Sequence, residues 1–266
     1  MTKSALFYVF LGLFFHGCAT SPTGRHQLLL VGDGQMNSMG TQAFSEMKSK
    51  QAIEHDPAVN AYVKCVAGAV AREASDKTGV KDWEIVVFRD PSANAFALPG
   101  GKIGVHTGIL SVANTADQLG AVLGHEVGHV IARHGNERVS QAMAAQGGLA
   151  IASVATSGSK DQATLMAALG LGTQFGVLLP HGRKQESEAD LIGLDLMARA
   201  GFNPEQSVEL WRNMAKASGG KQPPQWLSTH PSNEKRMEDL TAHMASARTT
   251  YQSAMAAGRR PSCSKP

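Results

Sequence analysis

Apolar residues recur at helical spacing through most of this chain, and one region departs from that pattern. Trp83–Phe88 (WEIVVF) has the composition of a buried strand, and the segments at 92–98 and 102–106 flank the turn Pro99-Gly100-Gly101, which indicates a hairpin. We therefore predict an α+β fold that is mostly helical, with one small mixed sheet. The i, i+3, i+4 spacing predicts helices at residues 34–51, 57–79, 117–134, 137–155, 183–200, 204–217 and 232–257.

Local signals set several of the predicted helix ends. Asp33 and Thr115 stand where side-chain caps are favoured. Asp56-Pro57 is a start signal, because proline is well tolerated at the first helical position. Gly135-Asn136 is expected to end the helix that begins near residue 117.

The apolar stretch at 147–179 raises the question of a membrane span. Lys160 and Asp161 split it into pieces that are too short to cross a bilayer. We expect packed helices here, with a membrane-dipping hairpin as the alternative.

The N-terminus has the features of an export signal. Ala5–Phe15 is an unbroken apolar run with the length of a signal-peptide core, and small residues and Cys18 follow it. This order resembles a bacterial lipoprotein signal, which would leave Cys18 as a lipidated N-terminus. The alternative is an ordinary cleaved signal with an incidental cysteine. Ala19 follows the cysteine, and alanine rather than aspartate at that position resembles lipoproteins that are sent to the outer membrane.

These features divide the chain into four expected parts. They are a signal peptide at 1–17, a polar leader or tether at 18–32, one main domain at 33–258 and a C-terminal tail at 259–266.

Composition and charge narrow the class of protein only slightly. Of the 266 residues, 42% are hydrophobic and 18% are charged, which excludes a disordered chain. The formal net charge of +3 is too small to indicate an acidic partner, and no run of aromatic and basic residues suggests a nucleic-acid surface. We expect no nucleic-acid partner.

Two cysteines, Cys65 and Cys263, remain beside Cys18. In an oxidising compartment they could pair, since Cys65 lies beside the apolar stripe of its predicted helix and is open to a C-terminal tail. Two free thiols are the alternative. The two cysteines do not have the spacing of a metal site.

The strongest chemical signal is His125-Glu126-Val127-Gly128-His129, an HExxH motif on a predicted helix. Residues at i and i+4 share a helix face, so both imidazoles can bind one metal ion. Glu126 lies one step around the helix and can reach a water on that ion. The alternative is a surface helix with two solvated histidines.

A catalytic zinc needs a third protein ligand and leaves one position for water. Glu186 and Asp190 are again i and i+4 on one predicted helix. Glu186 can bind the metal, and Asp190 can accept the other N–H of a ligand histidine. Glu188 should point elsewhere, solvated or in a salt bridge. A charged helix face near Arg183-Lys184 is the alternative reading.

Several motifs together resemble the M48 peptidases, and most closely their periplasmic lipoprotein branch, which acts on outer-membrane proteins. They are HExxH with the following Ala132-Arg133-His134, the ExEAD run at Glu186–Asp190, Ser228-Thr229-His230-Pro231 and the stretch Asn94–Leu110. The resemblance covers residues 18–240, most of the mature chain. It implies a zincin-like metallopeptidase fold built around an HExxH helix.

The resemblance also implies roles for individual residues. His125, His129 and Glu186 become the ligands of one zinc ion, Glu126 the general base and Asp190 the partner of a ligand histidine. Asn94, Ala95 and Phe96 would border the cleft on an edge strand, where an extended peptide can add by main-chain bonding; an ordinary hairpin is the alternative.

His230 would lie near the metal, as a fourth ligand that silences the enzyme or as an oxyanion helper. A structural loop histidine before Pro231 is the alternative. His134 follows His129 by five residues and is not expected to be a ligand. Arg133 is expected to pair with a carboxylate.

The motifs predict a zinc-dependent endopeptidase with Glu126 activating a zinc-bound water, and the resemblance implies unfolded or misassembled envelope proteins as its substrates. It would act on the periplasmic side of a bacterial envelope, anchored in the outer membrane by a lipid. A periplasmic chaperone or assembly factor with a latched zinc site is the alternative. The oligomeric state, the natural substrate and the activating trigger do not follow from the sequence.

Overall fold

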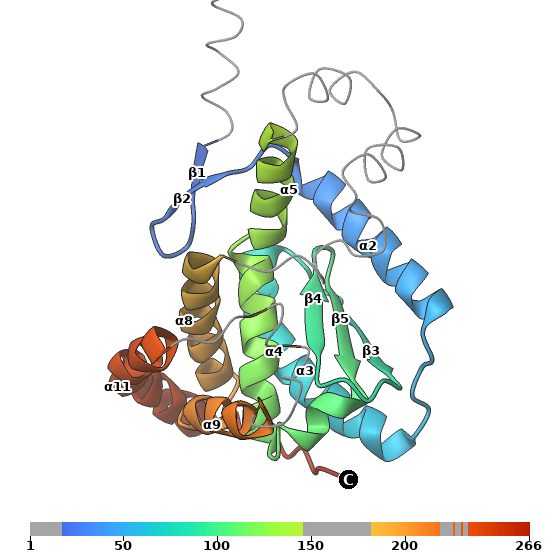
Figure 1. The fold of residues 1–266 in the computed structure, drawn as a ribbon. Coiled ribbons are helices and arrows are strands. Elements are labelled where there is room, and N and C mark those ends of the chain that lie inside the picture. The colour runs from blue at the N-terminus through green and yellow to red at the C-terminus, as the bar shows by residue number, and fades with distance from the viewer. Residues whose placement is uncertain (1–17, 146–181, 219–225, 227–229, 231–233) are drawn as a thin grey trace, which may run out of the picture.

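A computed structural model describes residues 18–145, 182–218, 226, 230 and 234–266. The fold is mostly helical, with a small sheet on one side of a central helix (Figure 1). Within the described residues, no helix combines the length and apolar character that a membrane crossing requires. The predicted signal peptide and the predicted helices at 147–179 lie outside the described residues.

From residue 33 on, the described helices and strands follow the predicted order, whereas the two short strands before it were not predicted. The elements are β1 (Cys18–Thr20), β2 (His26–Leu28), α2 (Asp33–Lys50), α3 (Pro57–Thr78), β3 (Glu84–Phe88), β4 (Ala95–Leu98), β5 (Lys102–His106), η1 (Thr107–Ser111), α4 (Ala116–Ile131), α5 (His134–Ala145), α8 (Arg183–Arg199), α9 (Gln206–Ser218) and α11 (Glu234–Ala256).

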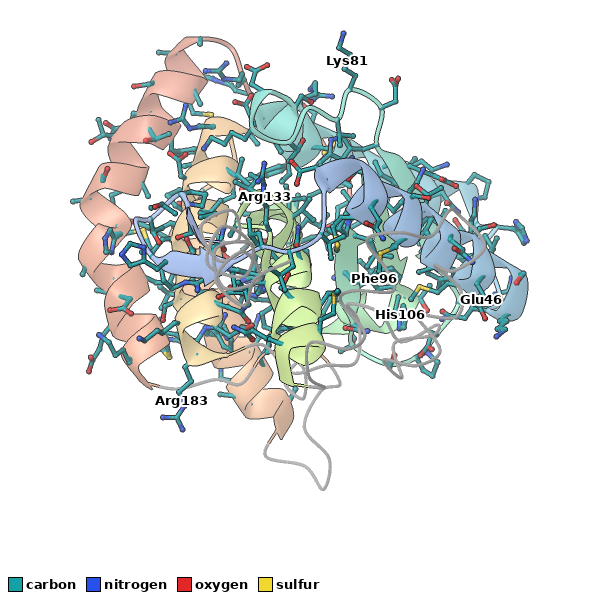
Figure 2. All side chains as sticks on the ribbon, turned by 90° about the horizontal axis from the view of Figure 1, so that it is seen from above. Glu46, Lys81, Phe96, His106, Arg133 and Arg183 are labelled. Carbon is teal, nitrogen blue, oxygen red and sulfur yellow. A yellow bond between two sulfur atoms is a disulfide. The ribbon has the colours of Figure 1, made fainter. Side chains whose placement is uncertain are left out.

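The sheet has the strand order β3-β5-β4, with β5 parallel to β3 and antiparallel to β4. Gly100 and Gly101 make the β4–β5 turn with φ of 81° and 72°, a conformation that favours glycine. Phe44 of α2 packs edge-on against Phe88 and Phe96 of the sheet. Phe96 also lies beside His106 of β5 (Figure 2). This aromatic cluster fixes the sheet against α2.

The prediction placed Asn94, Ala95 and Phe96 on the edge strand, and the structure corrects this in part. Asn94 precedes β4, its side chain is buried, and its carbonyl accepts a bond from the His106 N–H at 3.0 Å. Antiparallel pairing then directs the backbone groups of Phe96 toward β5 as well. Ala95 and Ala97 therefore carry the backbone groups that face the outer edge of β4, with which no strand of the described residues pairs.

Helix α4 is the centre of the molecule. The Thr115 hydroxyl caps its start, as predicted, by accepting a bond from the Gln118 N–H at 3.2 Å. Nearly all of its side chains are buried, because it contacts α3, α8 and β4. An HExxH motif on such a helix is not on a surface, so the alternative of two solvated histidines is wrong.

Two predicted helix ends differ from the observed ones. Helix α4 stops at Ile131 rather than at His134, because Arg133 adopts φ of 56° and turns the chain. Gly135-Asn136 therefore lies inside the first turn of α5 and breaks nothing. Asp33 is the first residue of α2 and not its cap; its carboxylate accepts a bond from Arg133 at 2.8 Å, which is the carboxylate pairing expected of Arg133.

The C-terminal helices α8 and α11 lie on the side of α4 away from the sheet (Figure 1). Helix α8 packs along α4, and α11 packs along α8 (Figure 1). The chain then returns to α3, where Cys263 forms a disulfide with Cys65 with a Cα–Cα distance of 5.7 Å. Of the two alternatives left by the sequence, the structure contains the bridge.

The segment expected to be a leader or tether is an ordered hairpin. Strands β1 and β2 pair antiparallel, and the turn between them carries Arg25. Its guanidinium forms ion pairs with Glu137 of α5 at 2.5 Å and with Glu188 of α8 at 3.0 Å. Glu188 is buried, so of its two expected states the solvated one is wrong and the salt-bridged one is found.

Candidate metal centre

Four side chains from three segments meet in the middle of the molecule. His125 and His129 come from α4, Glu186 from α8, and His230 from the segment before α11. Each offers a ligand atom, all these atoms lie within 4.8 Å of one another, and all four residues are buried. The structure thus brings together the three expected ligands and His230, which joins them as the resemblance implied.

The separations suit a single small ion. His125 Nε2 lies 3.0 Å from His129 Nε2 and 3.4 Å from Glu186 Oε2, and His129 Nε2 lies 3.5 Å from Glu186 Oε1. Tetrahedral ligands at zinc distances lie about 3.3 Å apart. Two imidazoles and one carboxylate are also a donor set that zinc prefers. The residues present therefore fit zinc.

Asp190 orients His125. The Nδ1 of His125 lies 2.9 Å from Asp190 Oδ1, and because a carboxylate can only accept, Nδ1 must carry the proton. The Nε2 lone pair is then directed at the other donors. Burial lowers the pKa of His125, but the hydrogen bonds and charges of Asp190 and Glu186 outweigh burial and raise its pKa to about 9. Protons therefore compete with a metal for this nitrogen.

Arg236 of α11, which the sequence analysis did not single out, holds both carboxylates of α8. Its guanidinium bonds Asp190 at 2.5 and 2.7 Å and pairs with Glu186 at 2.8 Å, and its side chain is wholly buried. It also stacks over Trp211, 4.2 Å from the ring centre. The positive charge helps to keep the pKa of Asp190 below its usual range against the effect of burial. No local pattern marked Arg236, since it lies 46 residues from Asp190 in the chain.

His134 orients the second imidazole. It is absent from the donor group, as expected, and its Nδ1 lies 2.7 Å from His129 Nδ1. Its Nε2 lies 3.1 Å from Glu188 Oε2, to which it must donate. Burial lowers the pKa of His134, which favours the neutral ring. Its Nδ1 then accepts from His129, whose Nε2 lone pair is left for a metal.

Glu126 lies beside the donor group and is buried. Its Oε1 accepts a bond from the indole Nε1–H of Trp226 at 2.6 Å and lies 3.4 Å from His230 Nε2. Trp226 in turn stacks on His230, with ring centres 4.8 Å apart. The sequence analysis missed Trp226, although it lies four residues before the histidine that was singled out.

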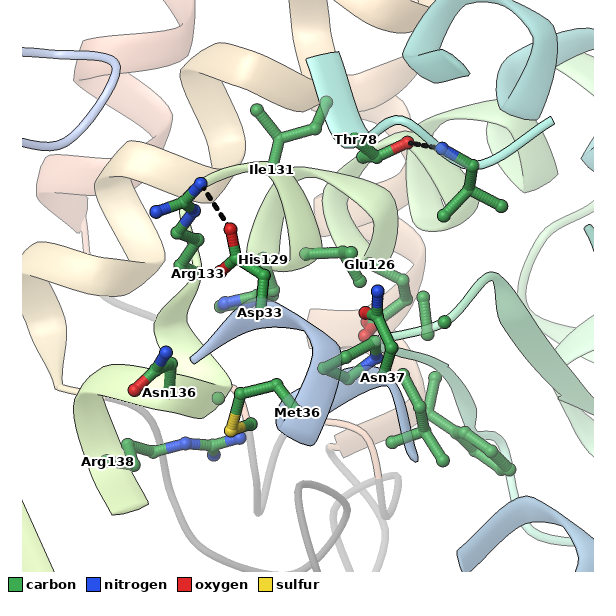
Figure 3. Close-up of a pocket in the computed structure, with 18 of the residues that line it drawn as sticks. Asp33, Met36, Asn37, Thr78, Glu126, His129, Ile131, Arg133, Asn136 and Arg138 are labelled. Carbon is green, nitrogen blue, oxygen red and sulfur yellow. Dashed lines mark hydrogen bonds and ion pairs between the residues drawn. The ribbon is translucent and has the colours of Figure 1, made fainter. Parts of the chain in front are cut away.

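A cleft opens from this group to the surface (Figure 3). Glu126 and His129 line its floor, the β4 segment lines one wall, and Met36 and Arg138 lie on the opposite side. The Asp33–Arg133 ion pair closes one end. The outer edge of β4, with Ala95 and Ala97, therefore borders the same cleft as the candidate base.

Sequence comparison agrees with this geometry. The profile of peptidase family M48 matches residues 57–244, which contain both metal-binding helices and the edge strand. This chain belongs to peptidase family M48. Members of M48 are metallopeptidases that use zinc, so zinc is the metal that the donor group is built to hold.

Similar M48 proteins come from mitochondria and from bacteria. The chain is 38% identical over 76% of its length to the mitochondrial metalloendopeptidase OMA1 of Schizosaccharomyces pombe, and 31% identical over 87% of its length to that of Homo sapiens. It is 28% identical over 77% of its length to the beta-barrel assembly-enhancing protease of Escherichia coli. The chain spans 59%, 47% and 43% of these three relatives.

Proposed function

We propose that this M48 chain is a zinc-dependent endopeptidase. The observation that carries the proposal is the convergence of His125, His129 and Glu186, with Glu126 next to them and facing the same cleft. Zinc held by these three residues would lower the pKa of a water toward about 7 and polarise the scissile carbonyl.

The remaining chemistry belongs to the chain's own residues. An extended peptide bonds to the outward-facing backbone groups of Ala95 and Ala97, which places its own backbone along the cleft. Glu126 accepts the proton of the attacking water on a carboxylate oxygen and delivers it to the leaving amine. Asp190 and His134 keep the two imidazoles in the required tautomer throughout.

Main-chain bonding selects for extended conformation more than for sequence. Unfolded chains supply such segments, whereas folded domains do not. Together with the signal-like N-terminus and Cys18, this supports unfolded or misassembled envelope proteins as substrates. We further propose that the protein acts on the periplasmic side of the envelope, held by a lipid on Cys18 in the outer membrane. The Escherichia coli relative is a beta-barrel assembly-enhancing protease, and its name supports the same class of substrate.

The test compares the zinc-loaded full chain with its Glu126→Gln variant on an unfolded outer-membrane barrel protein and on the same protein folded in detergent. We expect cleavage of the unfolded form only. The amide of the variant cannot accept the proton, so its rate should fall by about 10²–10⁴-fold while its zinc content stays at the wild-type value. Equal cleavage by the variant would refute the role of Glu126.

A second function has support from His230 and Trp226. His230 stands among the metal donors, and Trp226 bonds the candidate base. Both contacts would keep the site closed, as in a chaperone or assembly factor with a latched zinc site. This alternative predicts that the purified, zinc-loaded chain suppresses aggregation of the barrel protein without cutting it.

A further inference from the structure

We propose that Thr23 and Arg25, in the hairpin next to the expected lipid anchor, are positioning residues for the zinc ligand His129. They act through Glu188 and His134. The inference rests on the proposed zinc site, and it gives the N-terminal hairpin a role in the site beyond that of a tether.

The hairpin holds Glu188 from both sides. The Thr23 hydroxyl donates to Glu188 Oε1 at 2.7 Å, and the Arg25 Nε–H donates to Oε2 at 3.0 Å. The Arg25 guanidinium also makes two bonds to Glu137, at 2.5 and 2.6 Å, which fix its plane. The Glu188 side chain is only 2% exposed, so these partners replace water around its carboxylate.

Glu188 connects the hairpin to the metal centre through His134. Its Oε2 receives the bond from His134 Nε2, and the other nitrogen of His134 meets His129 Nδ1. Because a carboxylate can only accept, His134 donates to Glu188 through Nε2–H, and the Nδ1 of a neutral His134 ring then accepts from His129. That order of donation places the proton of His129 on Nδ1 and keeps the lone pair of its Nε2 among the other metal donors.

The arrangement around His125 supports this interpretation. There, Arg236 of α11 holds Asp190, and Asp190 holds His125. A carboxylate of α8, held by an arginine from outside that helix, thus orients His125 directly and His129 through His134. For His129 this arginine is Arg25 of the hairpin, which holds Glu188. Partners of this kind fix ring orientation and raise the basicity of the ligand.

A purely structural role for the hairpin is the competing explanation. The N-terminal segment also docks through a hydrogen bond that involves neither Glu188 nor a metal ligand. The Leu30 N–H donates to the Ser140 hydroxyl of α5 at 2.8 Å. Ser140→Ala therefore loosens the same segment without touching Glu188, and it serves as the matched control.

The experiment measures the zinc dissociation constant of the full chain by competition with a chelator, and the visible spectrum of the cobalt-substituted protein. We expect the double variant Thr23→Val, Arg25→Gln to raise the dissociation constant by about 10-fold, the lower end for partners of metal ligands, and to shift the cobalt bands. Thr23→Val alone, which keeps every ion pair, should give a smaller change in the same direction, and Thr23→Ser should restore the wild-type values.

Two results would overturn the inference. One is wild-type zinc affinity and spectrum in both the double variant and Thr23→Val. The other is an equal loss in Ser140→Ala, which would make the effect one of docking alone. If wild-type protein itself retains no zinc, the proposed function fails, and that outcome is distinct from both.

Discussion

His230 contacts both the candidate metal ligands and the candidate base. Its Nδ1 lies 3.1 Å from both His125 Nε2 and Glu186 Oε1, and its Nε2 faces Glu126. Burial would raise the pKa of Glu186, but His230 and His125 outweigh burial and hold it well below its usual range. A fourth donor at this position takes the place that a water needs for catalysis.

We expect His230→Ala to raise peptidase activity if His230 is a latch. The physical reason is that three ligands remain while one metal position opens to water. The measurement is the initial rate of casein cleavage at saturating zinc, with Glu126→Gln, His230→Ala as the control for contaminating proteases. An unchanged rate contradicts the latch, and a large fall would instead assign His230 to the oxyanion.

At the scale of elements, the site exists because α4 and α8 approach each other closely. Added Cβ atoms at Gly124 and Gly128 would lie 2.7 and 2.8 Å from carbonyl oxygens of α8, and one at Gly193 would lie 2.6 Å from the His125 backbone nitrogen. Glycine at these three positions is therefore a packing requirement. It lets the two imidazoles of one helix reach the carboxylate of the other.

Gly193→Ala should push α8 away from α4. We expect a loss of roughly 1–3 kcal/mol in the free energy of unfolding, as for other overpacked interiors, together with weaker zinc binding. Urea unfolding and chelator competition measure the two effects. Gly68→Ala in α3 is the control, because its Cβ would meet only the Arg72 guanidinium at 3.8 Å and should not destabilise. Unaltered zinc affinity in Gly193→Ala would show that helix spacing does not set the site.

The helices and strands were predictable because their signals are local. Thr115, Asp56-Pro57 and Gly79 mark ends that the structure retains, since capping depends on neighbours within a few residues. The end at Arg133 was not predictable, because its left-handed conformation accompanies an ion pair with Asp33, 100 residues away.

The difference between local signals and long-range contacts also explains which residues of the site were predicted and which were missed. His125, His129, Glu186 and Asp190 share helix faces at i and i+4, and this spacing is visible in the sequence. Arg236 and Trp226 reach the site from distant segments, and so do Thr23 and Arg25, more than 160 residues before Glu188. Only the packed fold brings these residues together.

At the scale of the whole molecule, the disulfide fastens the C-terminal tail to α3. Cys65 and Cys263 are separated by 198 positions, so the bridge closes most of the chain into one loop. Such a bond is stable in an oxidising compartment, which agrees with the proposed export.

Replacing both cysteines by serine should lower the free energy of unfolding by roughly 5 kcal/mol, because a long loop loses much entropy on closure. Urea unfolding with and without reductant measures the loss, and Cys18→Ser is the control that leaves the bridge intact. Zinc content should not change, since neither cysteine is among the metal donors. Equal stability of the serine variant and the wild type would contradict this role.

The zinc environment of the purified full chain tests the central claim most directly. X-ray absorption at the zinc edge, with metal analysis, should give one zinc per chain with nitrogen and oxygen ligands at about 2.0–2.1 Å, imidazole scattering and no sulfur. A correctly folded chain that retains no zinc, or a spectrum with sulfur ligands, would contradict a metal centre built from His125, His129 and Glu186.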